Sequence, residues 1–527
     1  MFASQQLTAP AVTRFFVHDE STSSEMLMDE AVSEMIREFL SETEIAVPVS
    51  NLVERFSETT IHDHPMAPEQ YVESLRDDVV DHANRIASPR SLSHMSQGLP
   101  WFSRPIARLV TAMNQNLTKA DASRSLTLCE REALATLHRL LYQRSDEFYQ
   151  THVQKRESTL GIVTSGGTLA NLTAMWCARN TALKATGKFA GIEHEGLLAA
   201  LQYYGYRDAV VIGPESMHYS FAKAIGLMGL GERNLFRVPL DSTGRVKVDV
   251  MRDAVEQCQK EGKCILAIVG VAGSTDAGAI DPLNELADLA ASVGTAFHVD
   301  AAWGGPLLFS KLHATRLAGI ERADTVTLDG HKQLYLPLGI GMLLFREPQR
   351  AKAIEKHANY LSRPGSDDLG CRSLEGSRSG MVLHLHAALR LFGRTGYAQL
   401  VEHGIRMAQL LCQRISHSVD FELLILKPDS NLVLYRYLPV EYRDRLAHDA
   451  LTWEDQQAIN QFNERLHQAQ LDAGSTCVSR TTVQCTRYGQ AVPLVALRAV
   501  VANPLTSAED LEAVLNDQVA LANQLSK

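Results

Sequence analysis

The amino-acid sequence predicts an α/β protein built around a mostly parallel central sheet with helices on both faces. Between about residue 158 and residue 345, short β-branched runs alternate with helical patterns, as expected for successive βαβ units. Polar residues recur where the predicted strands end, and ligands bind at that edge of an open α/β sheet. The chain has 527 residues, which is long enough for two or three domains.

Apolar, β-branched runs predict five buried strands in this central region, at residues 161–164, 209–212, 265–269, 296–300 and 325–328. After the first two strands, helices are expected to begin near Thr168 and Tyr219. A further helix is expected after the third strand, because Asp281 is a plausible N-cap and Pro282 suits the first helical position. This alternation of strands and helices is what predicts the parallel sheet.

The flanking regions predict two smaller parts. Residues 23–40 form the amphipathic pattern of one helix, which lies either on the surface, the simpler expectation, or against a partner subunit. Strands of a smaller sheet and a closing helix are predicted towards the C-terminus, at residues 421–425, 432–435, 495–501 and from 507 onwards. We therefore expect an N-terminal helical segment (1–113), a large domain (114–388) and a small C-terminal α/β domain (389–527).

Composition argues against several classes of function. The net charge of −10 and the lack of a basic tract predict no nucleic-acid partner. The eight cysteines form no CxxC or CxxH pair, and no metal site is predicted. The sequence has neither a signal-peptide pattern nor an apolar stretch of 18 residues, which predicts a cytoplasmic enzyme with no membrane contact.

The segment Thr164-Ser165-Gly166-Gly167-Thr168 predicts an anion cradle between a strand and a helix. Glycines permit close backbone approach, free N–H groups point outward, and the helix dipole favours a phosphate. On its own, the same pair of glycines is equally typical of a plain tight turn.

Asp300 and Lys332 each follow a predicted strand. Asp300 could bind a metal, cap a helix or pair with a protonated heterocycle, and the first is disfavoured because no partner has suitable spacing. Lys332, in the run Asp329-Gly330-His331-Lys332, could be a nucleophile with a lowered pKa or simply a solvated lysine.

Taken together, the cradle, His218, Asp300 and Lys332 favour pyridoxal 5′-phosphate as the cofactor. A dinucleotide site would need GxGxxG with an acidic residue about 20 positions later, and a nucleotide site would need GxxxxGK[ST]. Neither pattern occurs in the chain.

The sequence resembles the group II pyridoxal-dependent decarboxylases over roughly residues 90–510. The resemblance rests on six motifs in the family's order: TSGGTLAN, SMHYSFAKA, GSTDAGAIDP, HVDAAWGG, DGHK and LRAVVANPLT. It is greatest to the bacterial glutamate-decarboxylase-like subgroup that acts on aspartate. It implies the type I aminotransferase-like fold, and a homodimer whose active sites form between subunits, with contacts from the N-terminal segment.

The resemblance also implies roles for the cofactor site. Lys332 would carry the cofactor as a Schiff base, and Asp300 would keep the pyridine nitrogen protonated. His218 would stack on one ring face with Ala302 on the other, and Thr275 would position the ring. The phosphate would be held by the cradle and by a nearby histidine, namely by Ser165, Gly166, Gly167, Thr168 and His331.

Four further residues are implied by position in the family. Tyr360, in a polar loop, would donate a proton to Cα, although a loop tyrosine is usually a surface aromatic. Arg498 would bind a substrate carboxylate, or else pair with a structural acid. His94 stands where glutamate decarboxylases have Gln, so His94 or Gln97 would suit a smaller diacid; a core or surface histidine is equally compatible with the pattern.

The predicted reaction is the decarboxylation of L-aspartate to β-alanine and CO₂, a route towards pantothenate. L-Glutamate is the second candidate, because the two substrates differ by one methylene, worth only about 1–3 kcal/mol. Decarboxylation of diaminobutyrate or aromatic amino acids, a different pyridoxal-phosphate reaction such as amino-group transfer, and a non-catalytic binding role also stay open, because the fold alone does not fix the function.

Overall fold

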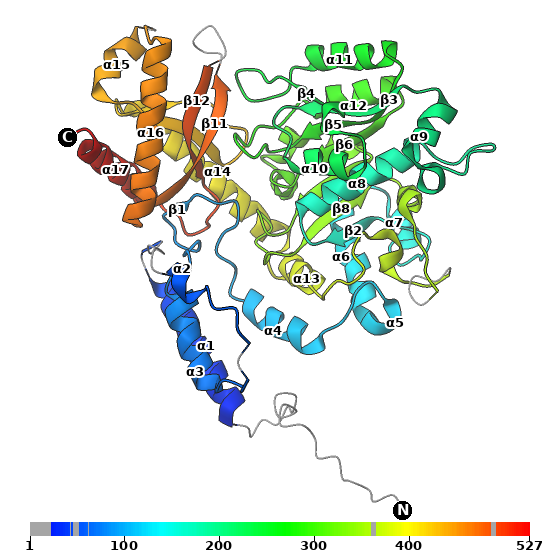
Figure 1. The fold of residues 1–527 in the computed structure, drawn as a ribbon, viewed down its shortest axis with the longest axis horizontal. Helices are drawn as coiled ribbons and strands as arrows, with labels where there is room; N and C mark the ends of the chain where they lie inside the picture. Colours follow the sequence, from blue (N-terminus) through cyan, green and yellow to red (C-terminus); the bar gives the residue numbers. More distant parts are fainter. Residues whose placement is uncertain are drawn as a thin grey trace, which may run out of the picture.

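The computed structural model describes residues 23–42, 44–45, 52–61, 63–359, 365–448, 450–485 and 492–527. A large domain and a smaller domain lie side by side, and an arm of helices projects from the body (Figure 1). None of the helices in the described ranges is long and apolar enough to cross a membrane.

The large domain is organised around a seven-stranded sheet in the order β2-β8-β7-β6-β5-β3-β4. Its strands are β2 (Gly161–Thr164), β3 (Asp208–Pro214), β4 (Leu235–Val238), β5 (Lys263–Val271), β6 (Ala296–Asp300), β7 (Thr325–Asp329) and β8 (Gly341–Phe345). The ladders from β4 to β7 are parallel, and β8 is antiparallel to both β7 and β2. All five predicted strands are confirmed, and the predicted α/β class is confirmed with them.

Helices cover both faces of this sheet. They are α6 (Ser125–Tyr142), α7 (Asp146–His152), α8 (Gly167–Ala182), α9 (Ile192–Tyr204), α10 (Ser220–Leu227), α11 (Val248–Lys260), α12 (Leu283–Ser292) and α13 (Val382–Leu391). Alternate strand residues enter two separate cores: Val210 and Ile212 pack in one, whereas Val211 packs in the other. Burial on both faces explains why the strands are continuous apolar runs rather than alternating ones.

The start of α12 differs from the prediction. Its N-cap is Pro282, and no side chain caps the helix. The Asp281 carboxylate instead accepts the N–H groups of Val246 and Val271, each at 2.8 Å. Asp281 thus joins the end of β5 to the segment before α11 and is not a helix cap.

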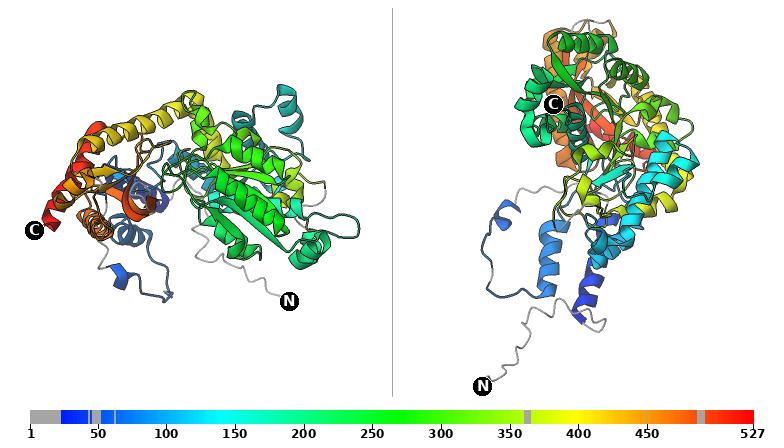
Figure 2. Two further views of the ribbon diagram at one scale, coloured as in Figure 1. Left: turned by 90° about the horizontal axis from the view of Figure 1, so that it is seen from above. Right: turned by 90° about the vertical axis from the view of Figure 1, so that its right-hand side faces the viewer.

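The small domain contains a five-stranded sheet in the order β1-β11-β12-β10-β9. Its strands are β1 (Ser91–Leu92), β9 (Phe421–Leu423), β10 (Leu432–Tyr437), β11 (Cys477–Cys485) and β12 (Val492–Val500), and its helices are α15 (Val440–Ala447), α16 (Trp453–Ala473) and α17 (Ala508–Leu525). Capping boxes begin α16 at Thr452 and α17 at Ser507. The long helix α14 (Gly393–His417) runs between the two domains (Figure 1, Figure 2).

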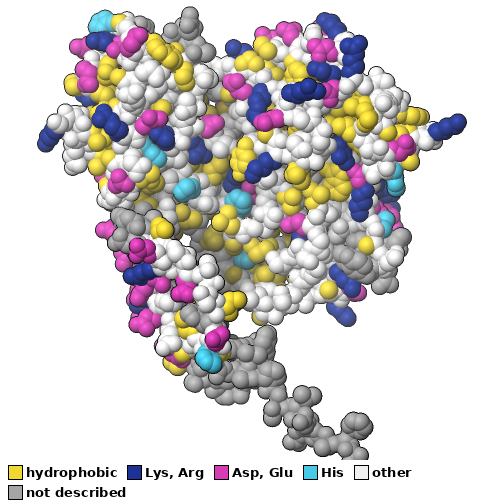
Figure 3. Space-filling model, viewed as in Figure 1, with side chains coloured by type: hydrophobic (Ala, Val, Ile, Leu, Met, Phe, Trp, Pro, Cys, Tyr) yellow, Lys and Arg dark blue, Asp and Glu magenta, His cyan; other side chains and the backbone are white. Residues whose placement is uncertain are grey.

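The N-terminal part consists of one long helix, α1 (Ser23–Ser41), and shorter ones, which are α2 (Leu52–Arg55), α3 (Pro68–Leu75) continued by a π-helical turn (Arg76–Val80), α4 (Ser103–Met113) and α5 (Ala120–Ser123). The predicted amphipathic helix is confirmed as α1. Apolar side chains of this arm reach the surface (Figure 3), among them Leu27 and Tyr71. Because β1 joins the sheet of the small domain, residues 91–92 are structurally part of that domain, and the boundaries at 113 and 388 stay predictions.

Candidate active site

A cavity of about 490 Å³ lies where β5, β6 and β7 end and α8 begins. It brings together all ten residues predicted to bind the cofactor. The lining residues are Ser165, Gly166, Gly167, Thr168, Leu169, Asn171, Ser216, His218, Tyr219, Val271, Gly273, Thr275, Asp300, Ala302, Asp329, His331 and Lys332. Since parallel strands end at the same edge, the fold itself gathers these side chains.

The predicted cradle forms the turn from β2 into α8. A side chain at Gly167 would place its Cβ 2.9 Å from Asp329 Oδ2, and a side chain at Gly341 would place its Cβ 2.5 Å from the Gly166 carbonyl carbon. The Gly167 N–H donates to Asp329 Oδ2 at 3.2 Å. The helix therefore starts at Gly167, at a point too tightly packed for a Cβ, and its N-terminal end lines the cavity, where the helix dipole favours an anion.

Asp300 ends β6 and is buried. Its Oδ1 accepts the backbone N–H of Ala302 at 3.1 Å, and its Oδ2 accepts Nδ2 of Asn171 at 2.8 Å. Two donors on different oxygens hold the plane of the carboxylate. The remaining lone pairs can accept a hydrogen bond from an N–H or O–H group of a ligand in the cavity.

Lys332 follows β7 on a turn that returns into β8. At Gly330, a Cβ would lie 2.9 Å from the Ile340 carbonyl oxygen, which explains the glycine in this turn. Tyr335 has a φ of 56°, which is strained for a residue with a side chain, and its hydroxyl donates to the Ala502 carbonyl at 2.6 Å. The small domain thus supports the turn that presents Lys332 to the cavity.

His218 lies just before α10, with Nδ1 accepting the Ser220 N–H at 3.3 Å. Burial lowers the pKa of His218, the Asp300 carboxylate opposes that shift, and Lys332 adds to it. An unprotonated Nδ1 agrees with the neutral imidazole that a lowered pKa favours.

His331 and Asp329 also face the cavity. Their atoms Nδ1 and Oδ1 lie 2.9 Å apart. Among the described residues, Ser216 Oγ in the same wall is buried and has no hydrogen-bond partner. A turn with a glycine at the start of the helix, a buried acid, a lysine and a wall hydroxyl with no partner fit the phosphate, ring nitrogen and aldehyde of pyridoxal 5′-phosphate.

The predicted substrate residues lie outside this cavity. Arg498, on β12, donates from Nε to the Thr275 carbonyl and from Nη1 to Ser479 Oγ, both at 2.8 Å. Burial lowers the pKa of Arg498, and the Asp276 carboxylate opposes that shift. Thr275 itself lines the cavity, so one hydrogen bond separates Arg498 from the cofactor site.

Gln97 is buried and donates from Nε2 to the His94 carbonyl at 2.6 Å, while the His94 side chain is exposed. Neither residue lines the cavity. The position of Tyr360 is outside the described residues.

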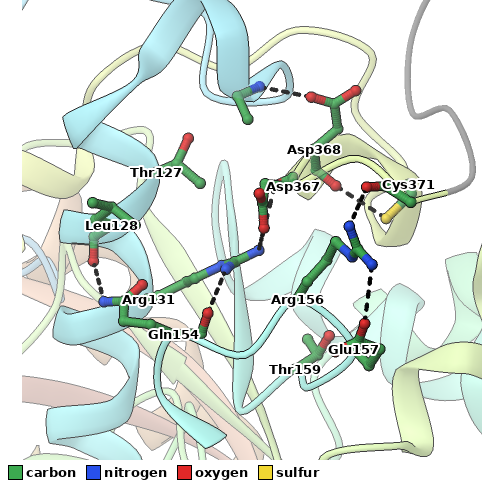
Figure 4. Close-up of polar contacts among 12 residues, drawn as sticks. Thr127, Leu128, Arg131, Gln154, Arg156, Glu157, Thr159, Asp367, Asp368 and Cys371 are labelled. Carbon is green, nitrogen blue, oxygen red and sulfur yellow. Dashed lines mark hydrogen bonds and ion pairs between the residues drawn. The ribbon is translucent and has the colours of Figure 1, made fainter.

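The described residues that follow Tyr360 in the chain are held by arginines (Figure 4). Arg131 of α6 donates to Asp367 Oδ1 at 3.3 Å, and Arg156 bonds the Gly365 carbonyl. Asp368 Oδ1 accepts the Ala120 N–H at 2.7 Å. Residues 365–368 are thus tied to α6, to the start of α5 and to the turn that follows α7.

Seven of the lining residues were not among the predicted site residues, and three of these are Asn171, Ser216 and Asp329. A signal existed for Asn171: it follows Gly167 by four residues on one helix, so the two share a helix face. Asp329 stood in the predicted DGHK run but received no role. Ser216 lies in the turn after β3 and begins the SMHYSFAKA motif, but it was given no role.

Known proteins agree with this geometry. The profile described as "Pyridoxal-dependent decarboxylase conserved domain" matches residues 51–438. An aspartate 1-decarboxylase of Aliivibrio fischeri is 38% identical over 518 residues, which cover 97% of this chain and 94% of that protein.

Solved structures show the same fold. Mouse CSAD in apo form superposes with a TM-score of 0.82 and 21% identity, covering 95% of this chain and 99% of that one. Oryza sativa TDC with PLP and tryptamine superposes with a TM-score of 0.78 and 19% identity, covering both chains completely. The chain therefore belongs to the family of pyridoxal-dependent decarboxylases and acts on an amino acid with pyridoxal 5′-phosphate as its cofactor.

Proposed function

We propose that the protein removes the α-carboxyl group of L-aspartate, giving β-alanine and CO₂. The observation that carries the proposal is the 38% identity, over almost the whole chain, to a protein named aspartate 1-decarboxylase. The product would supply pantothenate synthesis, and we propose that the enzyme works in the cytoplasm. L-Glutamate is the second candidate, because a single methylene changes binding by only about 1–3 kcal/mol.

The ten cavity residues predicted to bind the cofactor each have a proposed role. The cradle from Ser165 to Thr168, with His331, would bind the phosphate, and Lys332 Nζ would attach the cofactor covalently. Asp300 would accept a hydrogen bond from the protonated pyridine nitrogen and keep it protonated. His218 and Ala302 would face the two sides of the ring, and Thr275 would position it.

Held by these residues, pyridoxal phosphate would supply an electron-accepting ring for the loss of the carboxyl group from Cα. The protein would decide which bond breaks by orienting the substrate, because the bond to be cleaved must stand perpendicular to the ring. We propose that Arg498 grips a substrate carboxylate, with His94 or Gln97 suiting the site to a short diacid. CO₂ leaves, and the Tyr360 hydroxyl would deliver a proton to Cα, which completes the amine product.

The test is product analysis. Purified protein with added cofactor is incubated separately with aspartate, glutamate, 2,4-diaminobutyrate and aromatic amino acids. We expect β-alanine and CO₂ in equal amounts from aspartate, faster than any product from the other substrates. Exclusive formation of 4-aminobutyrate, or of an aromatic amine, would overturn the assignment to aspartate. Keto-acid formation in place of CO₂ would overturn decarboxylation itself.

We also propose a homodimer. Apolar side chains on the N-terminal arm and beside it are largely exposed in the single chain, including Met26 and Trp101 at 63% and 71% of their full areas. Such surfaces are typical of an interface that a second copy covers. Sedimentation should give twice the chain mass of 58.1 kDa, and a monomer would contradict the proposal.

A further inference from the structure

A chain of hydrogen bonds leads from Asp300 away from the cavity and into the core. Asn171 Nδ2 donates to Asp300 Oδ2 at 2.8 Å. Asn171 Oδ1 lies 3.2 Å from His298 Nε2, and His298 Nδ1 lies 2.9 Å from Thr325 Oγ1. The three side chains come from α8, β6 and β7, and each is at most 4% exposed.

The Asp300 carboxylate determines which group donates and which accepts in each of these hydrogen bonds. A carboxylate can only accept, so Asn171 presents its amide nitrogen to Asp300 and its carbonyl oxygen to His298. His298 must then donate from Nε2, which leaves Nδ1 bare to accept the Thr325 hydroxyl. The second hydrogen of Asn171 Nδ2 goes to Ser220 Oγ at 3.1 Å, which prevents the amide from flipping.

The three side chains that lead away from Asp300 are also uncharged. Burial lowers the pKa of His298 to about 4, so its imidazole is uncharged at neutral pH. A lysine or arginine in the place of Asn171 would neutralise Asp300 and weaken its attraction for a cationic ring nitrogen. Neutral donors hold the carboxylate in place and leave its charge available.

We propose that Asn171 is a positioning residue for Asp300, oriented by His298 and Thr325, and that it aims the carboxylate at the ring nitrogen of the cofactor. This inference rests on the proposed role of Asp300. Asn171 touches no reacting atom in the proposal. It acts by fixing the plane of Asp300 together with the Ala302 N–H.

The test replaces Asn171 with leucine, which has a similar volume and no donor. Asn180 supplies a matched control: it lies on the same helix nine residues, or about 14 Å, further on, is also buried, and donates to the Ala353 carbonyl. Cofactor affinity is measured by titrating the apoprotein with pyridoxal phosphate. The protonation of the ring nitrogen is measured from its ¹⁵N resonance.

We expect Asn171→Leu to weaken cofactor binding at least tenfold and to move the ¹⁵N resonance towards that of a neutral pyridine. Asn180→Leu should lower thermal stability comparably and change neither readout. A wild-type affinity and resonance in Asn171→Leu would overturn the proposal, and so would equal changes in both readouts in Asn180→Leu.

Two further variants complete the design. Thr325→Val keeps the side-chain shape and removes the hydroxyl that orients His298. We expect a smaller shift of the ¹⁵N resonance in the same direction, and this variant still tests the proposal if Asn171→Leu does not fold. An unchanged resonance in Thr325→Val would count against the proposal. Asp300→Asn tests the proposed role of Asp300, on which the inference about Asn171 rests. If Asp300→Asn also leaves the resonance unchanged, the proposed role of Asp300 fails, whereas a change in Asp300→Asn alone refutes only the part played by Asn171.

Discussion

At the scale of single residues, Arg498 has the most specific environment among the residues proposed to bind substrate. Its guanidinium bonds Thr275 and Ser479 at once, which fixes its plane. Lysine offers one compact point charge and lacks the planar fork that makes both bonds and still presents donors to a carboxylate. We therefore expect Arg498→Lys to raise KM for aspartate about tenfold, which corresponds to about 1.4 kcal/mol.

The measurement is steady-state kinetics, accompanied by a cofactor titration, which should be unchanged. Arg480 provides the control, because it lies on the neighbouring strand β11 and pairs with Glu464 on the exposed surface. Arg480→Lys should leave KM unaltered. An equal KM in Arg498→Lys and the wild type would remove Arg498 from the substrate site.

The cofactor residues could be predicted because they stand at the ends of parallel strands. Asp300 ends β6, and Lys332 follows β7 by three residues, so the topology alone brings them to one edge. The bond from Asn171 to Asp300 depends on how α8 is rotated against the sheet, which a local pattern does not specify. The position of Arg498 depends on the register between β11 and β12, where it pairs with Ser479.

At the scale of elements, one buried ion pair joins α6 to the segment before α13. Glu130 accepts two bonds from Arg378, at 3.1 and 2.9 Å, and both side chains are at most 5% exposed. Removing one member of such a pair leaves a buried charge without compensation. We expect Glu130→Ala to lower the free energy of unfolding by about 3–5 kcal/mol.

Urea unfolding of the two variants provides the comparison. Glu132, on the same helix, pairs with Arg390, but these side chains are 48% and 63% exposed. Glu132→Ala should therefore cost less than about 1 kcal/mol. The double variant Glu130→Leu, Arg378→Met should recover part of the lost free energy of unfolding. Equal stabilities for Glu130→Ala and Glu132→Ala would contradict the expected difference between a buried and an exposed ion pair.

Elements were predictable where composition alone separates strand from helix. Strand β8 is rich in Leu and Met and has no β-branched residue, so its apolar run does not distinguish the two. Strand β4 has only four residues, two of them partly or fully exposed, and β11 is largely polar. Strand β1 has two residues, and only its pairing with β11 makes it a strand.

At the scale of the whole molecule, two buried histidines predict acid sensitivity. Burial lowers the pKa of His138, on α6, and that of His298 to about 4. In the unfolded chain both would titrate near 6.5, so the unfolded state binds more protons between pH 4 and 6.5. The stability they contribute is complete above about pH 6.5 and is lost as pH falls to 4, at up to about 2.7 kcal/mol per pH unit for the pair.

Denaturant unfolding of the apoprotein at a series of pH values measures this slope. His138→Gln should reduce the slope by about half, because one titrating group is removed. His448, which is exposed, serves as the control, and its replacement by Gln should leave the slope unchanged. A wild-type slope in His138→Gln would mean that this histidine is not buried in its neutral form.

The pairing of β1 with β11 also sets an order of events during synthesis. Ser91 pairs with Cys477, so the 385 residues between the two partners must leave the ribosome before the second partner does. At about 5–20 residues per second, the earlier strand waits roughly 20–80 s for its neighbour. The large sheet, whose strands all lie between residues 161 and 345, can be complete within that interval. Nascent chains halted before residue 477 should already resist protease across the large sheet, while the stretch around residue 91 is still cut.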